Sequence, residues 1–568
     1  TRAQHKRRER AGREGAAGMG VTGLTQWARA ALPHAFVPAP ADAEHVHVDV
    51  NSLVHEAIRH VRDDDGALAS LAHRLDTLVA TVRPGMSLAL ALDGPAPLCK
   101  LTTQRARRLA RVRGGTLHAG PSSLAITPGT PFMARVDGAL AMWAALALVQ
   151  RKVGAATLIV VDPSSCPGEG EGKLHARLAA LPAHARAEHV HIVVGGDSDL
   201  LLLALNAPAR RVFVLDTAAH SSLSAGFGNG GTGSGKGRKR PAGSSQLFAF
   251  SCEAARDLLS RPCLKQVVLR PASAEAMACL AQKCVAEGGS ASLDLALLSV
   301  MQGCDYLPRL RGYSLGRAFD VLQAAKAKSA LLAAGGLAAN QGGLLISREP
   351  ISGELVLNAP ALCALLAAAF GGGAEEKEID DYNGGGGVEP PSGASGPGAP
   401  AAETGVLGYC SLALWAVDQA ASGVPAHWFV AWPPNAEPPH TSHLAATPTL
   451  IASARIPRNA RPPLPPAACA ALLLPAAAAR LLPAPLRPLV SVTGPLAAMF
   501  EAERCVECHE MRKRLGALQA LLEQLRSVAK AANAVAGSAE MQNVDACRKQ
   551  MGPAQRAYSE HRTSAHVE

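Results

Sequence analysis

Strand-like and helix-like patterns alternate over the first 200 residues of the chain. Residues 45–50 alternate between polar and apolar side chains, and the apolar ones are β-branched valines. Residues 87–93 form a continuous apolar run that ends in Asp, and the apolar run at 190–199 ends in Gly-Gly-Asp-Ser-Asp. Residues 67–82 and 132–149, which lie between these runs, have helical patterns. Strands that alternate with helices predict an α/β fold, with a mainly parallel central sheet flanked by helices on both faces.

The later parts of the chain have a different composition. Residues 226–245 are basic and rich in Gly and Ser, which predicts a disordered insertion, and residues 371–402 have the composition of a low-complexity linker. Residues 293–302 have the pattern of a buried helix, and residues 404–500 contain three of the five tryptophans. The amphipathic pattern of residues 501–535 predicts a further helix.

Charge and cysteine content narrow the choice of partner and compartment. A formal net charge of +10 fits an anionic partner such as nucleic acid about as well as it fits an ordinary basic protein. The 13 cysteines are irregularly spaced, which favours a reducing, intracellular compartment and leaves nucleus and cytoplasm open. No apolar segment follows the basic N-terminus, and prolines interrupt the apolar run at 472–489, so we expect neither a signal peptide nor a membrane partner.

Acidic side chains gather where the predicted strands end and where the chain is rich in glycine. Seven carboxylates stand out: Asp49, Asp93, Glu169, Glu171, Asp197, Asp199 and Asp305. Ligands collect at the carboxyl ends of parallel strands, and residues 167–173, if extended, would present Glu169 and Glu171 on one side. For any single acid, capping a helix is the commoner role. Seven converging carboxylates would repel one another unless cations neutralised them. Their hard oxygen ligands suit Mg²⁺ or Mn²⁺. Two such ions roughly 4 Å apart would promote hydrolysis of a phosphodiester.

A basic helix is predicted shortly after Asp93. Residues 100–113 contain six Lys and Arg, and no acid lies between residues 98 and 118. Lys100, Gln104, Arg107 and Arg108 share one helical face by their spacing, which makes a compact anion site. A charge run of this kind is by itself more often a solvated face, but its closeness to Asp93 favours a site for a terminal phosphate beside the acids.

With these motifs in place, the chain resembles the XRN family of 5′→3′ exoribonucleases. The order and chemistry of the motifs over residues 19–308 make the resemblance specific, and weaker similarity continues at 409–432 and 462–489. The matching motifs are Met-Gly-Val at 19–21, Val-Asp-Val-Asn-Ser-Leu-Val-His at 48–55, Leu-Asp-Gly-Pro-Ala-Pro at 92–97, Ile-Thr-Pro-Gly-Thr-Pro-Phe-Met at 126–133, Pro-Gly-Glu-Gly-Glu-Gly-Lys at 167–173, Gly-Asp-Ser-Asp at 196–199 and Asp-Tyr-Leu-Pro at 305–308.

The resemblance implies a role for each matching residue. All seven acids correspond to catalytic, metal-binding carboxylates of a PIN/FEN-like nuclease core, and Lys100, Gln104, Arg107 and Arg108 correspond to the 5′-phosphate pocket. His55 corresponds to the histidine that stacks on the first base, with Trp428 as its candidate partner and Trp432 as the alternative. A lone His55 would more often be a core histidine. The implied reaction is processive hydrolysis of single-stranded 5′-monophosphorylated RNA to nucleoside 5′-monophosphates, in RNA decay or processing.

The resemblance also organises the chain into parts and shows where it departs from the family. The predicted parts are a disordered leader at 1–18, a nuclease core at 19–350, the linker at 371–402, a second block at 404–500 that completes the nuclease domain, and a partly disordered helical tail at 501–568. Cys304 stands where the family has Asn, and the second block is rich in Ala. We expect a monomer whose C-terminal helix is available to a protein partner. The alternatives are a flap-type DNA nuclease, which shares much of the acidic set, and a non-catalytic RNA-binding relative.

Overall fold

The structure of the chain is a computed structural model that describes most of residues 21–564. The gaps in the description are 22, 60, 114–121, 217–246, 262–274, 277–279, 281–289, 334–343, 372–398, 434–435, 492–493, 501–502, 504 and 532–537. The predicted leader at 1–18 and the predicted insertion at 226–245 therefore lie outside the described residues.

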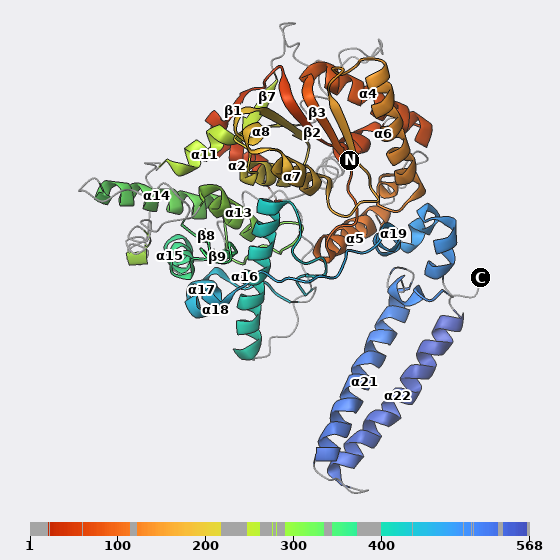
Figure 1. Cartoon of the computed structure of the whole chain (residues 1–568). Helices are drawn as coiled ribbons and strands as arrows, with labels where there is room; N and C mark the ends of the chain where they lie inside the picture. Colours follow the sequence, from red (N-terminus) through yellow and green to blue (C-terminus); the bar gives the residue numbers. More distant parts are fainter. Residues whose placement is uncertain are drawn as a thin grey trace, which may run out of the picture.

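A seven-stranded sheet is the centre of the fold, with strand order β1-β7-β6-β5-β2-β3-β4 (Figure 1). Its strands are β1 (Phe36–Pro38), β2 (Ala43–Asp49), β3 (Pro84–Ala91), β4 (Leu158–Asp162), β5 (Val190–Gly195), β6 (Arg211–Asp216) and β7 (Phe248–Ser251). β4, β3, β2, β5 and β6 are parallel, β7 runs antiparallel to β6, and the edge strand β1 pairs antiparallel with β7. The prediction of an α/β fold with a mainly parallel sheet is confirmed.

Helices cover both faces of this sheet because side chains alternate in direction along each strand. On one face Val46, Val48 and Leu90 join a core with α3 (Val50–Ala57), α4 (Asp64–Val82) and α6 (Pro131–Val149). On the other face Ala89 and Val193 join a core that includes the remaining helices of this layer. Those helices are α2 (Leu24–Ala31), α7 (Gly170–Ala180), α9 (Asp199–Asn206) and α11 (Cys252–Ser260). Shorter helical segments are η1 (Pro33–Ala35), η2 (Ser123–Ala125) and α8 (Ala183–Glu188).

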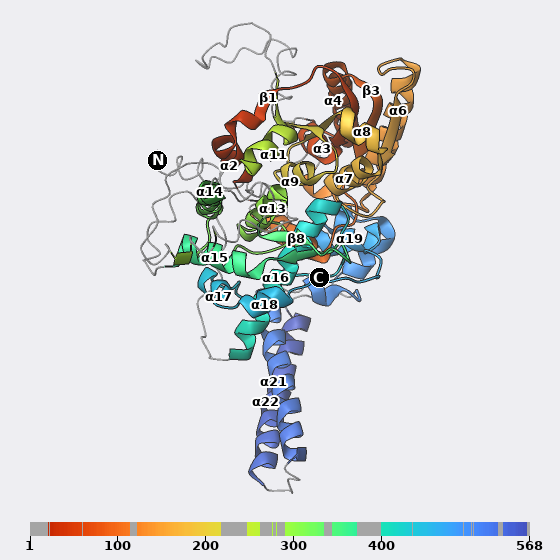
Figure 2. The same ribbon diagram turned by 60° about the vertical axis from the view of Figure 1, so that its left-hand side comes forward.

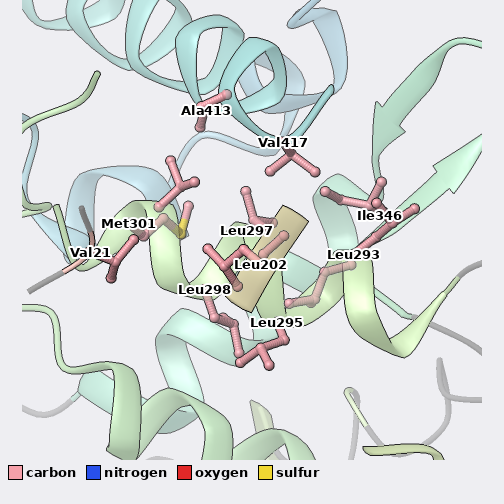
Figure 3. Packing of buried hydrophobic residues seen from close by; sticks show 14 of the residues in the cluster. Val21, Leu202, Leu293, Leu295, Leu297, Leu298, Met301, Ile346, Ala413 and Val417 are labelled. Atoms are coloured by element: carbon pink, nitrogen blue, oxygen red, sulfur yellow. The ribbon is translucent and has the colours of Figure 1, made fainter. Parts of the chain in front are cut away.

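A helical layer continues the second core away from the sheet. It contains α13 (Ala291–Met301), α14 (Leu315–Ala333), α15 (Ala359–Phe370), α16 (Ala399–Ser422), α17 (Thr441–Ala445), α18 (Pro448–Ser453) and the small antiparallel pair β8 (Ile346–Arg348) and β9 (Leu355–Leu357). Figure 3 shows Ala413 and Val417 of α16 facing Leu297 and Leu202 in this core. The block after residue 404 thus shares its core with the sheet, and α16 begins at Ala399, within the last residues of the predicted linker.

The C-terminal part contains the helix predicted within residues 501–535 and a second helix after it. Helix α19 (Pro466–Leu473) packs against α5 (Leu98–Arg113). After α19 come three short helical segments, η5 (Ala476–Leu481), η6 (Ala484–Val490) and η7 (Ala497–Phe500). Two long helices follow, α21 (Val506–Ala531) and α22 (Ala539–Ser564). They pair along their length through Leu522, Ala529, Val544 and Cys547, and the hairpin projects from the body of the molecule (Figure 2).

Helix α6 is the one described helix that is long and apolar enough to cross a membrane. Phe132, Val136, Leu140 and Trp143 of this helix are buried in the core against the sheet. Packing against the sheet accounts for the apolar composition of this face of α6.

Buried histidines cluster near the amino end of β2 and β5. The His45 ring stacks on that of His191 with centroids 4.9 Å apart, and it shares hydrogen bonds with Ser87 Oγ (2.8 Å) and His189 Nδ1 (3.0 Å). Burial, together with His191 and His189, lowers the pKa of His45 to about 4. Burial and the same kind of neighbour lower the pKa of His47 to about 3.

Acidification is expected to destabilise the fold through these histidines. The unfolded chain takes up protons near the ordinary histidine pKa of about 6.5, whereas folded His45 stays neutral until about pH 4. The neutral state therefore contributes stability above pH 6.5, and roughly 1–3 kcal/mol of it should be lost between pH 6.5 and 4. Glu44, which also faces His45, opposes this effect, whereas Arg177 near His47 adds to it.

Urea unfolding monitored between pH 4 and 8 would measure this loss. The matched variant is His45→Gln, which keeps a polar side chain beside Ser87 but does not titrate in this range. A shallower pH dependence is expected for the variant than for the unchanged chain. Identical slopes in both proteins would show that His45 does not carry the effect.

Candidate active site

The carboxyl ends of β2 and β3 bring the first two acids together. Asp49 is the last residue of β2, level with Ala91 of β3, and its carboxylate accepts a hydrogen bond from the Asn51 amide (3.1 Å) at the start of α3. Asp93 follows β3 by two residues and accepts from the Gly170 amide (2.7 Å). A Cβ built at Gly170 would lie 3.2 Å from Asp49 Oδ1 and 3.4 Å from Asp93 Oδ1. The glycine thus allows both carboxylates to approach one backbone segment.

Glu169 and Glu171 do not lie on an extended segment, so the prediction from their spacing is wrong on this point. Glu169 is the residue before α7, and Glu171 lies in the first turn of that helix. Gly168, with φ of +99°, makes the turn that brings the chain into the helix. Both glutamates are nevertheless buried at the same edge of the sheet as Asp49. Acids in a first helical turn also interact favourably with the helix dipole.

Gly94 fixes the segment between Asp93 and the basic helix. Its amide donates to Gly168 O (2.8 Å), and the Gly168 amide donates in return to Pro95 O (2.9 Å). A Cβ at Gly94 would lie 1.6 Å from the Cys166 carbonyl oxygen. No side chain fits there unless the two backbone segments separate.

Gly94→Ala is expected to lower the free energy of unfolding by about 2–4 kcal/mol, because overpacking against backbone cannot be relieved by a rotamer change. Denaturant unfolding followed by circular dichroism would measure the loss. The control is Gly138→Ala on α6, where nothing lies within 4 Å of the added Cβ. That substitution should be neutral or stabilising by up to about 1 kcal/mol, and equal behaviour of the two variants would contradict the expectation.

Asp197 and Asp199 follow β5, where α9 begins. Asp199 Oδ1 accepts from the Val21 amide (2.8 Å), and Asp197 Oδ1 accepts from the Asp199 amide (3.3 Å). The start of the described chain is therefore part of the site, and Ser198 Oγ also donates to Val21 O (3.1 Å). Asp305, on the turn after α13, is only 2% exposed.

Lys100 lies within the group of acids. Its Nζ is 2.5 Å from Glu169 Oε2, 3.7 Å from Asp305 Oδ2 and 3.9 Å from Glu171 Oε1. Arg107 binds Asp305 through two nitrogens, at 2.6 and 3.3 Å. Burial alone would lower the pKa of Lys100, but Glu169 and the other neighbouring acids raise it well above its ordinary value.

The seven acids form one electrostatic group, whose members are Asp49, Asp93, Glu169, Glu171, Asp197, Asp199 and Asp305. Burial and neighbouring carboxylates raise the pKa of Asp49, Glu171 and Asp199 well above their ordinary values, and that of Asp197 to about 6. Lys100 and Arg107 supply two positive charges against seven carboxylates, so the group has a large deficit of positive charge. The coordinates thus bring together all the acids that the sequence analysis selected.

The donor set fits hard divalent cations. Glu171 Oε1 and Asp199 Oδ2 are buried without a hydrogen-bond partner among the described residues, and carboxylate oxygens are the ligands that Mg²⁺ and Mn²⁺ prefer. As the side chains stand in the described part of the chain, no group of three or more His, Cys, Asp or Glu residues is arranged to hold a metal ion. The ammonium of Lys100 lies between the carboxylates of Glu169, Glu171 and Asp305.

Gln104 and Arg108 lie at a small pocket beside this group. The pocket, about 20 Å³ in volume, is also lined by Asn51, Asp93 and Glu169. Arg108 has only neutral partners in the described chain: Thr127 Oγ1 (3.0 Å), Ile126 O (3.4 Å) and Gln104 Oε1 (3.5 Å). The predicted phosphate-binding residues therefore divide, with Gln104 and Arg108 at the pocket and Lys100 and Arg107 bound to acids.

His55 is within electrostatic reach of the basic helix, and Trp428 contacts the first residue of that helix. Burial, followed by the charge of Arg111, lowers the pKa of His55 to about 4, and Asp93 and Arg108 also act on it. The Trp428 carbonyl accepts from the Leu98 amide (2.8 Å) where α5 begins. The Trp432 ring instead packs edge-on against Tyr409, and its Nε1 donates to Ala436 O (2.8 Å). Of the two tryptophans, Trp432 is thus committed to packing, and the stacking role of Trp428 stays a prediction.

Two side chains that the sequence analysis did not select hold Glu169 in place. Tyr306 Oη donates to both Glu169 oxygens (2.9 and 3.0 Å), and Gln419 Nε2 of α16 donates to Tyr306 Oη (3.0 Å). The motif at 305–308 contained a signal for Tyr306, but nothing in the sequence pointed to Gln419, which reaches the site from the second block. Lys173 was also missed, and its Nζ donates to Leu92 O (2.7 Å) and Pro163 O (2.9 Å).

Comparison with known proteins identifies the region that carries these acids. Residues 19–218 match the family model described as XRN 5′-3′ exonuclease N-terminus. The chain is 26% identical over 237 residues to "5′-3′ exoribonuclease 2" of Candida albicans, which is 33% of this chain and 24% of that protein. It is 27% identical over 202 residues to "5′-3′ exoribonuclease 2 homolog" of Drosophila melanogaster, which is 30% and 22% of the two chains.

A third relative, "5′-3′ exoribonuclease 2" of Saccharomyces cerevisiae, is 26% identical over 196 residues, 29% of this chain and 20% of that protein. The similarity is modest but falls on the region that contains β2 to β6 and six of the seven acids. Residues 19–218 are thus similar to the N-terminal region of the XRN 5′-3′ exonucleases, and the chain spans about a quarter or less of the length of the curated relatives that it matches.

Proposed function

We propose that the chain is a 5′→3′ exoribonuclease with a PIN/FEN-like core. It would hydrolyse single-stranded RNA from a 5′-monophosphate end and release nucleoside 5′-monophosphates. The observation that best supports this proposal is the buried group of seven carboxylates next to a guanidinium that has only neutral partners. The family-model match of residues 19–218 and the names of the relatives agree with RNA as the substrate.

Two Mg²⁺ or Mn²⁺ ions would be held by the seven acids. Such ions supply a water of lowered pKa and neutralise the charge that develops on the phosphodiester. Tyr306 and Lys100 both bind Glu169 and would fix the direction of its oxygens. The Val21 amide would likewise hold Asp199 by one oxygen and leave the other, Oδ2, directed to a cation.

The polarity of degradation would come from the pocket of Gln104 and Arg108. Arg108 is held by Thr127, so its charge is positioned before any anion arrives. Burial, with Arg111 and Arg107 nearby, lowers the pKa of Arg108 to about 10, as expected for a guanidinium without a carboxylate partner. The pocket is too small for a triphosphate or a cap, and at about 20 Å³ it would also have to widen to admit a monophosphate.

Stacking would keep the chain on its substrate between cleavages. His55 and Trp428 are the proposed stacking pair, because both lie beside α5, which lines the phosphate pocket. Stacking on a π-face accepts any base, which is the property that processive degradation requires.

The test compares three RNAs of one sequence that differ only at the 5′ end: monophosphate, hydroxyl and triphosphate. With Mg²⁺, mononucleotide release should be fastest from the monophosphate by at least about 10-fold, the effect of losing one charge-assisted contact. A 5′-phosphorylated branched DNA serves as the comparison substrate. Faster cleavage of the DNA would identify a flap-type nuclease, and RNA binding without release of mononucleotide would identify a non-catalytic relative.

A further inference from the structure

A second, larger cavity shares a wall with the phosphate pocket. Its volume is about 570 Å³, in the range of small-molecule sites. Loop 122–130 contributes to both cavities: Ile126 and Pro128 line the first, and Ala125 and Thr130 line the second. The other walls of the larger cavity come from the start of α4, the first turns of α6, and η5 and η6 of the second block.

Arginines dominate the charge of this cavity. Arg480 and Arg62 make no ion pair in the described chain, and Arg487 bonds only the Leu482 carbonyl oxygen, through Nε (3.0 Å). The acids are largely committed elsewhere: Arg135 binds both Asp64 and Asp65. Asp63, the remaining acid of the lining, accepts from the Gly66 amide (2.8 Å) as the cap of α4. Three available guanidinium groups thus face a cavity with one unneutralised carboxylate.

The cavity also has an apolar wall. Phe132, 5% exposed, Pro131 and Leu481 form it, and Phe132 and Leu481 are anchored in the core of the sheet. Guanidinium groups and an apolar wall in one cavity suit a ligand that carries both a phosphate and a flat ring.

We infer that this cavity is a site for a nucleoside 5′-monophosphate. The inference rests on the proposed function, of which this nucleotide is the product. Arg480 and Arg487 bind the phosphate dianion, and the wall of Phe132, Pro131 and Leu481 receives the base. The volume fits one nucleotide, which favours a released product over a strand of RNA.

The shared loop gives the site a consequence for the phosphate pocket. Thr127 Oγ1 accepts from Arg108 and donates to Leu124 O (2.8 Å), and Thr130 Oγ1 donates to Ala125 O (2.6 Å). A ligand against Ala125 and Thr130 therefore contacts the same loop that positions Arg108. Binding of the product in the second cavity therefore affects binding of a phosphate in the first.

The experiment is calorimetric titration of AMP into the full chain and three double variants, with inorganic phosphate as a second ligand. Arg480→Ala/Arg487→Ala removes the proposed phosphate contacts, and Gln104→Ala/Arg108→Ala alters the first pocket. Arg514→Ala/Arg526→Ala removes the same charge from exposed positions on α21. Arg480→Ala/Arg487→Ala should weaken AMP binding to the larger cavity by about 10-fold or more. It should leave intact the separate AMP binding to the first pocket, which Gln104→Ala/Arg108→Ala removes.

Each outcome decides the matter. Unchanged AMP affinity in Arg480→Ala/Arg487→Ala, or equal weakening in Arg514→Ala/Arg526→Ala, overturns the inference. Phosphate binding as tight as AMP binding overturns the role of the apolar wall. If Arg480→Ala/Arg487→Ala instead weakens binding of a 5′-hydroxyl RNA strand more than binding of AMP, the cavity binds the RNA strand and the inference is overturned. RNA degradation is measured on the same samples: its absence in the unchanged chain refutes the proposed function, whereas unchanged AMP affinity with full degradation refutes only the inference.

Discussion

Asp197→Ala should reduce release of mononucleotide from 5′-phosphorylated RNA by about 10³-fold or more, the loss seen when a group that stabilises developing charge is removed. The Asp197 carboxylate accepts a hydrogen bond from the Asp199 amide and lies within electrostatic reach of Glu169 and Asp305. Its removal would deprive the group of a carboxylate and release the start of α9. Initial rates with saturating RNA would measure the effect.

The control for Asp197→Ala is Asp257→Ala on α11, an exposed acid that contacts only Arg261 in the described chain. This control should degrade RNA at the normal rate. Binding of 5′-phosphorylated RNA should persist in Asp197→Ala, because the phosphate pocket is lined by other residues. Retention of more than a tenth of the activity in Asp197→Ala would contradict the assignment of catalysis to this group.

Arg108→Ala is expected to lower kcat/KM for 5′-monophosphate RNA by about 10- to 100-fold, as the loss of a charged hydrogen bond predicts. The rate on 5′-hydroxyl RNA should change little, because that substrate has no terminal phosphate for Arg108 to bind. The preference between the two RNAs should therefore shrink. Steady-state kinetics with both substrates would measure it.

Arg526→Ala serves as the matched control for Arg108→Ala, since it removes one arginine from an exposed position on α21. A uniform loss on both RNAs in Arg108→Ala would assign this side chain to general electrostatic attraction. Equal effects in both variants would remove Arg108 from the phosphate pocket altogether.

The sheet and its acidic edge could be predicted because they depend on short-range patterns. A buried strand followed by an acid, as at Asp49 and Asp93, identifies both a strand and the edge to which its end points. In a parallel sheet these ends must meet, so the sequence alone was sufficient to bring these acids together. The start of α7 at Gly170 was not predictable from the i, i+2 spacing of the two glutamates, since that spacing suits a strand as well as a first helical turn.

Side-chain partners from distant segments could not be predicted. Helical spacing places Lys100 and Arg107 on the same face as Arg108, but it cannot say that Asp305, some 200 residues later, binds two of these cations. Nothing in the sequence near these residues predicts that the backbone amide of Val21 donates to Asp199, or that the side-chain amide of Gln419 donates to Tyr306. These contacts follow from how the helical layer packs under the sheet.

The C-terminal hairpin shows a different limit. The pattern after residue 500 indicated a helical tail, but the bounds of α22 could not be predicted, because its mean hydropathy is low and its apolar contacts are few. Cys547 and Val544 are buried only because α21 lies against them. A helix whose partner is itself uncertain cannot be assigned from its own sequence.

Glu503, just before this hairpin, binds Arg105 of the basic helix and accepts from the Ala476 amide (2.7 Å). Arg105 and Glu503 are 398 positions apart. A ribosome adds about 5–20 residues per second, so this brace would form roughly 20–80 s after helix α5 has been synthesised. Cys469 and Leu473, which close the phosphate pocket, arrive almost as late. A nascent chain would therefore lack a complete phosphate pocket until residues 469–473 have been synthesised.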